Sequence, residues 1–292
     1  MEYRQDILKQ LQNVELSMLK LFDSVCSKYN IKYFLIFGTA IGAMRHNGFI
    51  PWDDDIDVAV FRDDLDKLRN VPREEWKDNL LVFPDDGTPF HRLCFPRLYK
   101  KGTKFSDVDN WKLIKSKDKN NNHITPIWID VQVYDRIDAP EQIECIAREK
   151  IRFRSLYRVA KSDLKIDAKK GFKSIVRNVF RKMIFIGLNL RKNPELHYYT
   201  MYCCASKNVG KYVTNFDTMT YKEMFTSCCK YQEMFPLKRV KFESIVVNVP
   251  NNIDSILTSI YGDYMQLPPV EKRVNHSPAI LDFGDGINVV GK

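Results

Sequence analysis

The chain has 292 residues, of which 44% are hydrophobic and 12% aromatic, with only 12 Gly and 13 Pro. This composition excludes collagen-like, low-complexity and wholly disordered proteins, and predicts a globular protein of one large or two modest domains. The net charge of +9 is concentrated, because residues 148–192 hold 15 Lys or Arg against three acidic residues. The rest of the chain is mildly acidic, so we expect a basic arm that favours an anionic partner.

The sequence shows no signal-peptide pattern and no run of about 18 uncharged apolar residues. Its seven cysteines are odd in number and include no CxxC pair of the kind that opens a zinc site. We therefore expect a cytoplasmic protein with reduced thiols.

Hydrophobic residues at three- and four-residue spacing between Leu8 and Val25 predict a long amphipathic helix that ends near residue 30. The run 31–37 (IKYFLIF) is β-branched and aromatic, and it predicts a buried strand that stops at Gly38. Thr39 is then predicted to be the N-cap of a short helix.

A second strand is predicted over 56–61, with a helix over 62–70 after it. Further strands are predicted over 93–98 and 127–133, on either side of a polar loop at 115–123.

The sequence becomes helical and basic from 141 to about 202, returns to strand-like alternation over 235–249, and ends its regular pattern with a helix over 253–261. A mixed sheet flanked by helices, which is an α+β fold with a helical basic insertion, is the economical interpretation. The predicted domain organisation has three parts: a catalytic core at 1–140, a basic helical region at 141–205, and strands, a helix and a tail that complete the site at 206–292.

Two carboxylates stand out in the segment PWDDDIDVAV. Residues two apart share a face of a strand, so Asp55 and Asp57 are predicted to point the same way while their apolar neighbours face the core. Adjacent carboxylates repel, and a site that keeps both ionised usually holds a divalent cation between them. A solvated acidic turn is the alternative interpretation.

Asp130, in the segment IWIDVQV, shares a strand face with Trp128 and Gln132. A strand next to Asp55 and Asp57 would bring Asp130 to the same site, as metal-assisted phosphoryl transfer requires. On its own Asp130 is as readily explained by a structural role. Gly38 and Thr39 end a strand and begin a helix, which presents free N–H groups to an anion such as phosphate.

The segment FGTAIGAMRHNGFIPWDDDIDVAV closely resembles the signature of the LicD family, which includes the fukutin-related transferases. The later segments FPRLYKKGT, IWIDVQVYD and YGDYMQLPPVEKRVNHSP also resemble the family pattern, whereas the basic helical middle matches least.

The resemblance implies a nucleotidyltransferase-like fold and a Mg²⁺ or Mn²⁺ site. It also implies transfer of a substituted phosphate such as phosphocholine from a CDP-linked donor to a hydroxyl of a cell-surface glycan or its lipid-linked precursor, with release of CMP. On this basis Asp55, Asp57 and Asp130 are the expected metal ligands and catalytic carboxylates, and Gly38 and Thr39 the expected contacts of the donor phosphates.

Basic side chains in the segments around these carboxylates are candidates for binding the donor diphosphate, because guanidinium groups suit phosphate oxygens. Arg45 and Arg97 are preferred, since each sits among apolar residues. Further candidates are Arg92, Lys101, Arg273 and His276.

Two other functions remain open. In the first, Asp55 and Asp57 would hold the metal of a glycosyltransferase that consumes a sugar nucleotide. In the second, the protein is not an enzyme and uses its basic arm to bind a membrane or a nucleic acid. The aromatic residues of the arm form no RNA-binding signature, so we expect no nucleic-acid partner.

The segment 173–192 predicts an amphipathic basic helix. Lys173, Arg177 and Arg181 fall four residues apart, while apolar residues crowd the other side. Such a helix lies in the headgroup region of an anionic membrane, so peripheral association with the inner membrane face is expected. A core helix with solvated basic residues is the alternative interpretation.

Overall fold

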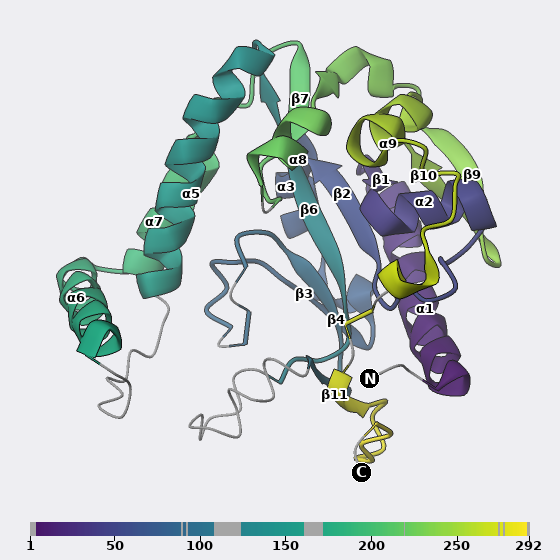
Figure 1. Cartoon of the computed structure of the whole chain (residues 1–292), viewed down its shortest axis with the longest axis horizontal. Coiled ribbons are helices and arrows are strands. Elements are labelled where there is room, and N and C mark those ends of the chain that lie inside the picture. Colours follow the sequence, from purple (N-terminus) through teal and green to yellow (C-terminus); the bar gives the residue numbers. More distant parts are fainter. Residues whose placement is uncertain are drawn as a thin grey trace.

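The protein is described by a computed structural model over residues 4–88, 90–91, 93–107, 124–160, 172–218, 220–273, 275–276 and 278–290. It has an α+β fold in which helices surround a mixed, curled sheet, as the sequence predicts (Figure 1). The predicted loop at 115–123 and the candidate Arg92 lie outside the described residues.

The helices of the described residues, in chain order, are α1 (Gln5–Lys28), α2 (Phe37–His46), α3 (Arg62–Arg69), α5 (Ile143–Ala160), α6 (Phe172–Asn189), α7 (Pro194–Cys204), α8 (Tyr221–Thr226) and α9 (Ile253–Tyr261). The strands are β1 (Tyr33–Leu35), β2 (Asp57–Phe61), β3 (Asn79–Val82), β4 (Arg97–Lys100), β5 (Lys104–Asp107), β6 (Trp128–Ile137), β7 (Tyr212–Asn215), β8 (Cys229–Lys230), β9 (Lys238–Phe242), β10 (Ile245–Val249) and β11 (Pro278–Asp282).

The main sheet has the strand order β1-β2-β6-β4-β3, and β7 extends the pairing of the long strand β6 at its far end. Strands β2 and β6 are parallel, with Asp57 opposite Asp130, whereas the other pairs in this sheet are antiparallel. The prediction that the strand of Asp130 lies next to that of Asp57 is therefore confirmed.

Both faces of the central strands are buried, which fixes their register. On one face Val58 and Val60 join Val131 and the apolar side of α1 in the largest core cluster. On the other face Ala59 and Phe61 pack in a second cluster. The strand ends are thereby held rigidly by apolar packing on two sides.

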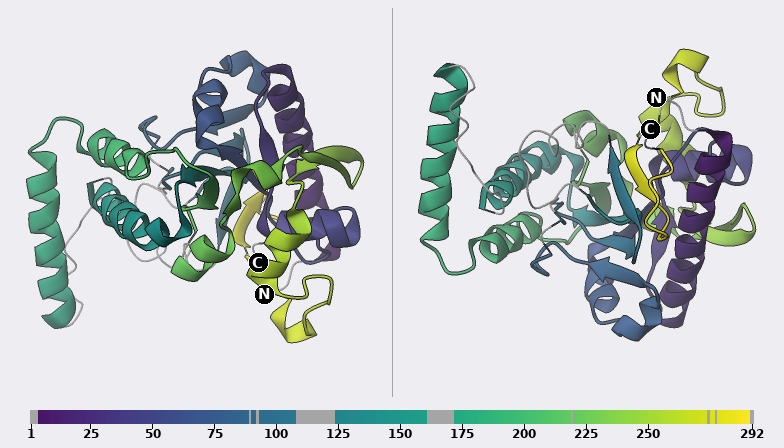
Figure 2. Two further views of the ribbon diagram at one scale, coloured as in Figure 1. Left: turned by 90° about the horizontal axis from the view of Figure 1, so that it is seen from above. Right: turned by 90° about the horizontal axis from the view of Figure 1, so that it is seen from below.

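The described parts of the basic middle, 141–160 and 172–205, are largely helical, as predicted. Helices α5 and α7 pack on each other through buried tyrosines, among them Tyr157 and Tyr202. Helix α6 lies at the far side of this pair, away from the sheet (Figure 2). No helix among the described residues is both long enough and apolar enough to cross a membrane. All seven cysteines are free thiols.

A buried ionic centre ties the helices to the sheet. The Asp135 carboxylate of β6 accepts from Arg62 Nε at 2.7 Å and Nη2 at 3.1 Å, and Lys150 Nζ of α5 lies 3.0 Å away. Lys150 also donates to the Tyr202 carbonyl oxygen of α7. The two cations hold the pKa of Asp135 well below its usual range despite its burial.

Several predicted boundaries were wrong. Helix α2 begins at Phe37 and its N-cap is Ile36, so the predicted cap at Thr39 is one turn too late. Asp55 was expected to share a strand face with Asp57, but β2 begins at Asp57 and Asp55 lies in the irregular segment before it. The strand predicted over 93–98 begins only at Arg97.

Candidate active site

The edge of the sheet where β2 begins carries the predicted carboxylates. Asp57 opens β2, and its N–H donates to the hydroxyl of Thr39 at 2.8 Å. Thr39 is buried in α2, so it ties the start of the strand to the helix. Gln132, two residues after Asp130 on β6, donates to Asp57 Oδ1 at 3.3 Å. The face that the sequence assigns to Asp130 and Gln132 is therefore the face of the site.

The segment before β2 adds further carboxyls. Removal from water raises the pKa values of Asp53 and Asp57 well above their usual range, with repulsion from Asp55 as the next cause. Removal from water also raises the pKa of Asp55, to about 6, although the neighbouring His276 partly opposes this shift. Glu15 of α1 lies beneath them, and its Oε2 atom is buried without a hydrogen-bond partner among the described residues. The site is thus strongly short of positive charge.

Asp130 is paired with Arg97, its register partner on β4. Both Asp130 oxygens accept from the guanidinium, through Nε and, at 3.2 Å, through Nη2. The Arg97 guanidinium also lies 4.3 Å from the centre of the Trp128 ring. The structure therefore brings Asp130 to Asp57 but already supplies Asp130 with a cation.

A histidine from the C-terminal part reaches the same carboxylates. The His276 backbone N–H and ring Nδ1 both contact the buried Asp54 carboxylate, the latter at 2.9 Å, and Nε2 lies 3.9 Å from Asp55 Oδ2. The hydrogen bond to Asp54 raises the pKa of His276 to about 9. His276 thus places a positive charge beside Asp55.

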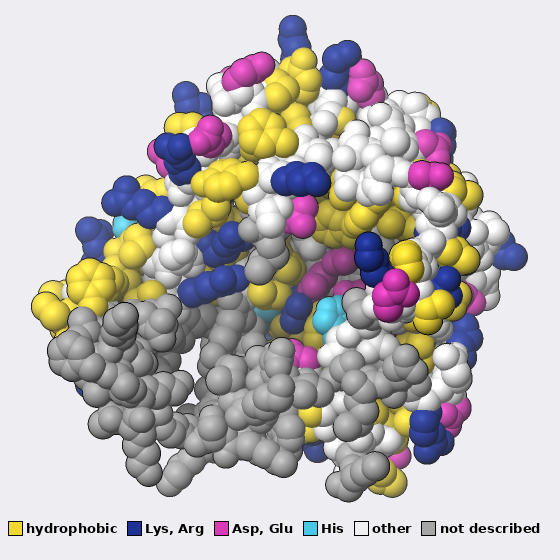
Figure 3. Space-filling model, viewed as in Figure 1, with side chains coloured by type: hydrophobic (Ala, Val, Ile, Leu, Met, Phe, Trp, Pro, Cys, Tyr) yellow, Lys and Arg dark blue, Asp and Glu magenta, His cyan; other side chains and the backbone are white. Residues whose placement is uncertain are grey.

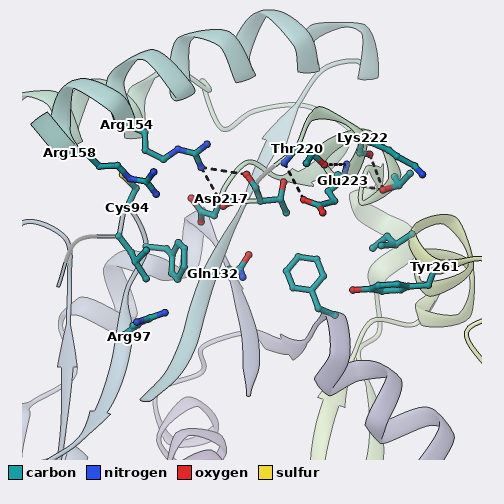
Figure 4. A pocket seen from close by; sticks show the side chains of 16 residues that line it. Cys94, Arg97, Gln132, Arg154, Arg158, Asp217, Thr220, Lys222, Glu223 and Tyr261 are labelled. Atoms are coloured by element: carbon teal, nitrogen blue, oxygen red, sulfur yellow. Dashed lines mark hydrogen bonds between the residues drawn. The ribbon is translucent and has the colours of Figure 1, made fainter. Parts of the chain in front are cut away.

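A cavity of about 580 Å³ borders this edge of the sheet. Figure 3 shows the same face hollowed, with acidic side chains inside and basic side chains around them. Figure 4 shows Arg154 and Arg158 reaching into the cavity from α5, opposite Gln132 and Arg97. Tyr261 of α9 faces them from the other side. The cavity therefore combines guanidinium groups with an aromatic wall.

The other predicted residues lie in different surroundings. Gly38 packs so closely that a Cβ atom there would lie 2.9 Å from Asp53 Oδ2. Arg45 donates to the carbonyl oxygens of Tyr264 and Gln266, and it lines a separate cavity together with Arg273.

Lys101 donates to the Lys77 carbonyl oxygen on an exposed surface. Phosphate binding by Gly38, Thr39 and Arg45 stays a prediction.

The contribution of α5 to the cavity was not expected from the sequence. Arg154 and Arg158 were counted in the basic arm, although their i, i+4 spacing puts them on one helical face. Their proximity to Arg97 depends on how α5 packs over the sheet, which local periodicity does not reveal.

Comparison with known proteins confirms the resemblance seen in the sequence. Residues 30–143 match the family described as LicD/FKTN/FKRP, nucleotidyltransferase domain. They form a LicD-family domain. A relative is the lipopolysaccharide cholinephosphotransferase LicD of Haemophilus influenzae, which is 27% identical over 92% of this chain and 95% of its own length. An uncharacterized protein of Rickettsia prowazekii is 39% identical over 18% of this chain and 20% of its own length.

The LicD-family domain supplies Asp55, Asp57, Arg97 and Asp130 to the site. Residues beyond it complete the surroundings, since α5 brings its two arginines and the C-terminal segment brings His276.

The donor set of the LicD-family domain fits a magnesium ion. No group of three or more His, Cys, Asp or Glu within the described ranges is arranged to hold a metal by itself. Mg²⁺ is commonly bound by one or two carboxylates together with phosphate oxygens of a substrate. Asp55 and Asp57 supply such a pair, and the shortage of positive charge around them favours a cation. Asp130 as a third ligand stays a prediction.

Binding of Mg²⁺ to this pair is expected to depend on pH. Protons compete with the ion because the pKa values of Asp55 and Asp57 are raised, that of Asp55 to about 6. Millimolar Mg²⁺ should therefore raise the melting temperature clearly at about pH 8 and little at about pH 5. Without metal, the free energy of unfolding of the protein should fall as pH rises through the folded-state pKa values of Asp55 and Asp57. The reason is that the folded protein must then give up protons that the unfolded chain has already lost.

Thermal unfolding with Mg²⁺ and with EDTA at both pH values measures this effect. An equal Mg²⁺ effect at the two pH values would show that the ion binds elsewhere.

Proposed function

We propose that the protein transfers a substituted phosphate, with phosphocholine as the first candidate, from a CDP-linked donor to a hydroxyl of a glycan or its lipid-linked precursor. The proposal is supported by the LicD-family domain and by the relative that is named a lipopolysaccharide cholinephosphotransferase. The observation that carries it is that Gln132, which lines a cavity together with Arg97, Arg154 and Arg158, donates a hydrogen bond to the Asp57 carboxylate.

The cavity suits a nucleoside diphosphate. Arg154 and Arg158 present planar donors that can pair with phosphate oxygens, and the ring of Tyr261 offers a surface for a base or an alkyl group. The neighbouring carboxylates would repel a diphosphate on their own, so a cation between them and the phosphates is part of the proposal.

In the proposed reaction, the acceptor oxygen forms a bond to the distal phosphorus while the bond from that phosphorus to the CMP oxygen breaks. The acceptor hydroxyl gives up its proton to solvent, and CMP leaves as an anion. Asp55 and Asp57 would hold Mg²⁺, which supplies charge neutralisation of the phosphate oxygens when bound. Arg154 and Arg158 would hold the diphosphate in the cavity through charged hydrogen bonds to its oxygens.

The test is incubation with a panel of CDP-alcohols, namely CDP-choline, CDP-ethanolamine and CDP-glycerol, with Mg²⁺ and a lipopolysaccharide or lipid-linked glycan acceptor. Release of CMP together with modification of the acceptor is expected for one donor. Consumption of a sugar nucleotide with no CMP released from any CDP-alcohol would favour the glycosyltransferase alternative.

Substitutions on one helix test the role of the cavity arginines. Arg158→Gln should raise the KM for the donor by about tenfold, because a charged hydrogen bond to phosphate is lost. Arg152→Gln is the matched control, since Arg152 is exposed on the same helix and does not line the cavity. Equal donor KM values in the two variants would remove α5 from donor binding.

A further inference from the structure

Helix α6 leaves one apolar face uncovered. Val179, Met183 and Ile186 of α6 and Leu190 directly after it follow one another at spacings of four, three and four residues. The Leu190 N–H donates to the Ile186 carbonyl oxygen, which continues the helical turn, so all four lie on a single side of the helix. Their exposed fractions are 41%, 66%, 54% and 84%. Figure 3 shows hydrophobic side chains gathered at the left edge of the molecule, where α6 lies. Folded soluble domains seldom expose so continuous an apolar stripe.

The opposite side of α6 explains how the helix is held. Leu188 is buried in the cluster formed by α5 and α7, and Ile184 packs against the same cluster. The exposed stripe is therefore not the face that attaches α6 to the protein. Figure 2 shows α6 at one end of the molecule, with its outer side directed away from the sheet.

The charge around the stripe is of one sign. Between Ala168 and Pro194 the chain has eight Lys or Arg and no Asp or Glu. Among the described side chains, Lys182, Arg191 and Lys192 are exposed. An apolar stripe beside exposed cations complements the surface of a lipid bilayer, which has apolar acyl chains below a layer of anionic headgroups.

We infer that α6 docks on the surface of an anionic phospholipid bilayer, with its exposed stripe in the acyl boundary and its cations among the headgroups. A second copy of this chain fits the stripe less well, because it would bring two segments of high positive charge together. Docking is independent of the proposed reaction and does not require the cavity to bind a donor.

The test is co-sedimentation of the full chain with vesicles. Binding to vesicles of phosphatidylglycerol and phosphatidylcholine is expected, with none to phosphatidylcholine alone and with release at about 0.5 M NaCl. Met183→Ser combined with Leu190→Ser should weaken binding by about tenfold or more, because the buried apolar area is lost. Lys182→Glu combined with Lys192→Glu should abolish it through charge.

Val270→Ser is the matched control, because Val270 is 72% exposed and lies outside α6. All substituted positions are exposed, and thermal unfolding verifies that each variant is folded. Equal binding to both kinds of vesicle, or binding to neither, would overturn the inference. A concentration-dependent dimer that the Met183 and Leu190 substitutions abolish, without vesicle binding, would overturn it in favour of a second copy.

Discussion

Replacement of Asp57 by Asn is expected to lower the rate of transfer by about 10³-fold, which corresponds to about 4 kcal/mol of lost transition-state stabilisation. The variant keeps the shape of the side chain but removes one of the two charges that would hold the cation. The metal-free variant should melt at the same or a higher temperature at about pH 8, because repulsion with Asp55 is relieved. Turnover and thermal unfolding with EDTA measure the two effects.

The opposite signs of these effects make the experiment specific. If Asp57 were a structural carboxylate, its replacement would lower the stability of the protein. If it is a functional carboxylate that destabilises the fold, its replacement lowers activity without lowering stability. Asp66→Asn is the control, since Asp66 is exposed on α3 and should change neither quantity. Near-normal turnover of the Asp57 variant would end the assignment of this residue to the metal site.

A second large effect is expected at the buried ionic centre. Asp135→Asn should lower the free energy of unfolding by about 3–5 kcal/mol, because Arg62 and Lys150 would remain buried without their anion. Lys150 is 1% exposed and Arg62 is 13% exposed, so water can do little to replace the lost charge. Denaturant unfolding monitored by circular dichroism measures the change.

Glu144→Gln provides the contrast, because the exposed pair of Glu144 with Arg148 is expected to add nothing measurable. Combining Asp135→Leu with Arg62→Met and Lys150→Met should recover much of the lost stability, since no charge then stays buried. A loss of less than 1 kcal/mol in Asp135→Asn, about that of an average surface substitution, would show that water reaches the centre.

Much of the fold follows from local sequence pattern. The helix predicted over 253–261 matches α9, and the predicted strand at 56–61 differs from β2 by one residue. These elements have clear apolar periodicity. Strands β7 and β11 were missed because each is four or five residues long and depends on a partner far away in the sequence.

The candidate site was predicted unevenly for the same reason. The meeting of Asp57 with Asp130 could be predicted because two buried strands of similar pattern are natural neighbours. The pairing of Asp130 with Arg97 could not, since it depends on the register between β4 and β6. Thr39 was expected to cap a helix, but its hydroxyl instead accepts a hydrogen bond from the backbone N–H of Asp57 at the start of β2.

The contacts of the C-terminal segment bear on when the site can form during biosynthesis. Asp54 accepts hydrogen bonds from His276, which is 222 residues further along the chain. Strand β11 likewise pairs with β5, and α2 holds the carbonyl oxygens of Tyr264 and Gln266 through Arg45. A nascent chain on the ribosome therefore exposes its acidic cluster long before these contacts exist. The site therefore reaches its final form only after residue 276 has left the ribosome, so the contacts between His276 and Asp54 are among the last that the folding chain can make.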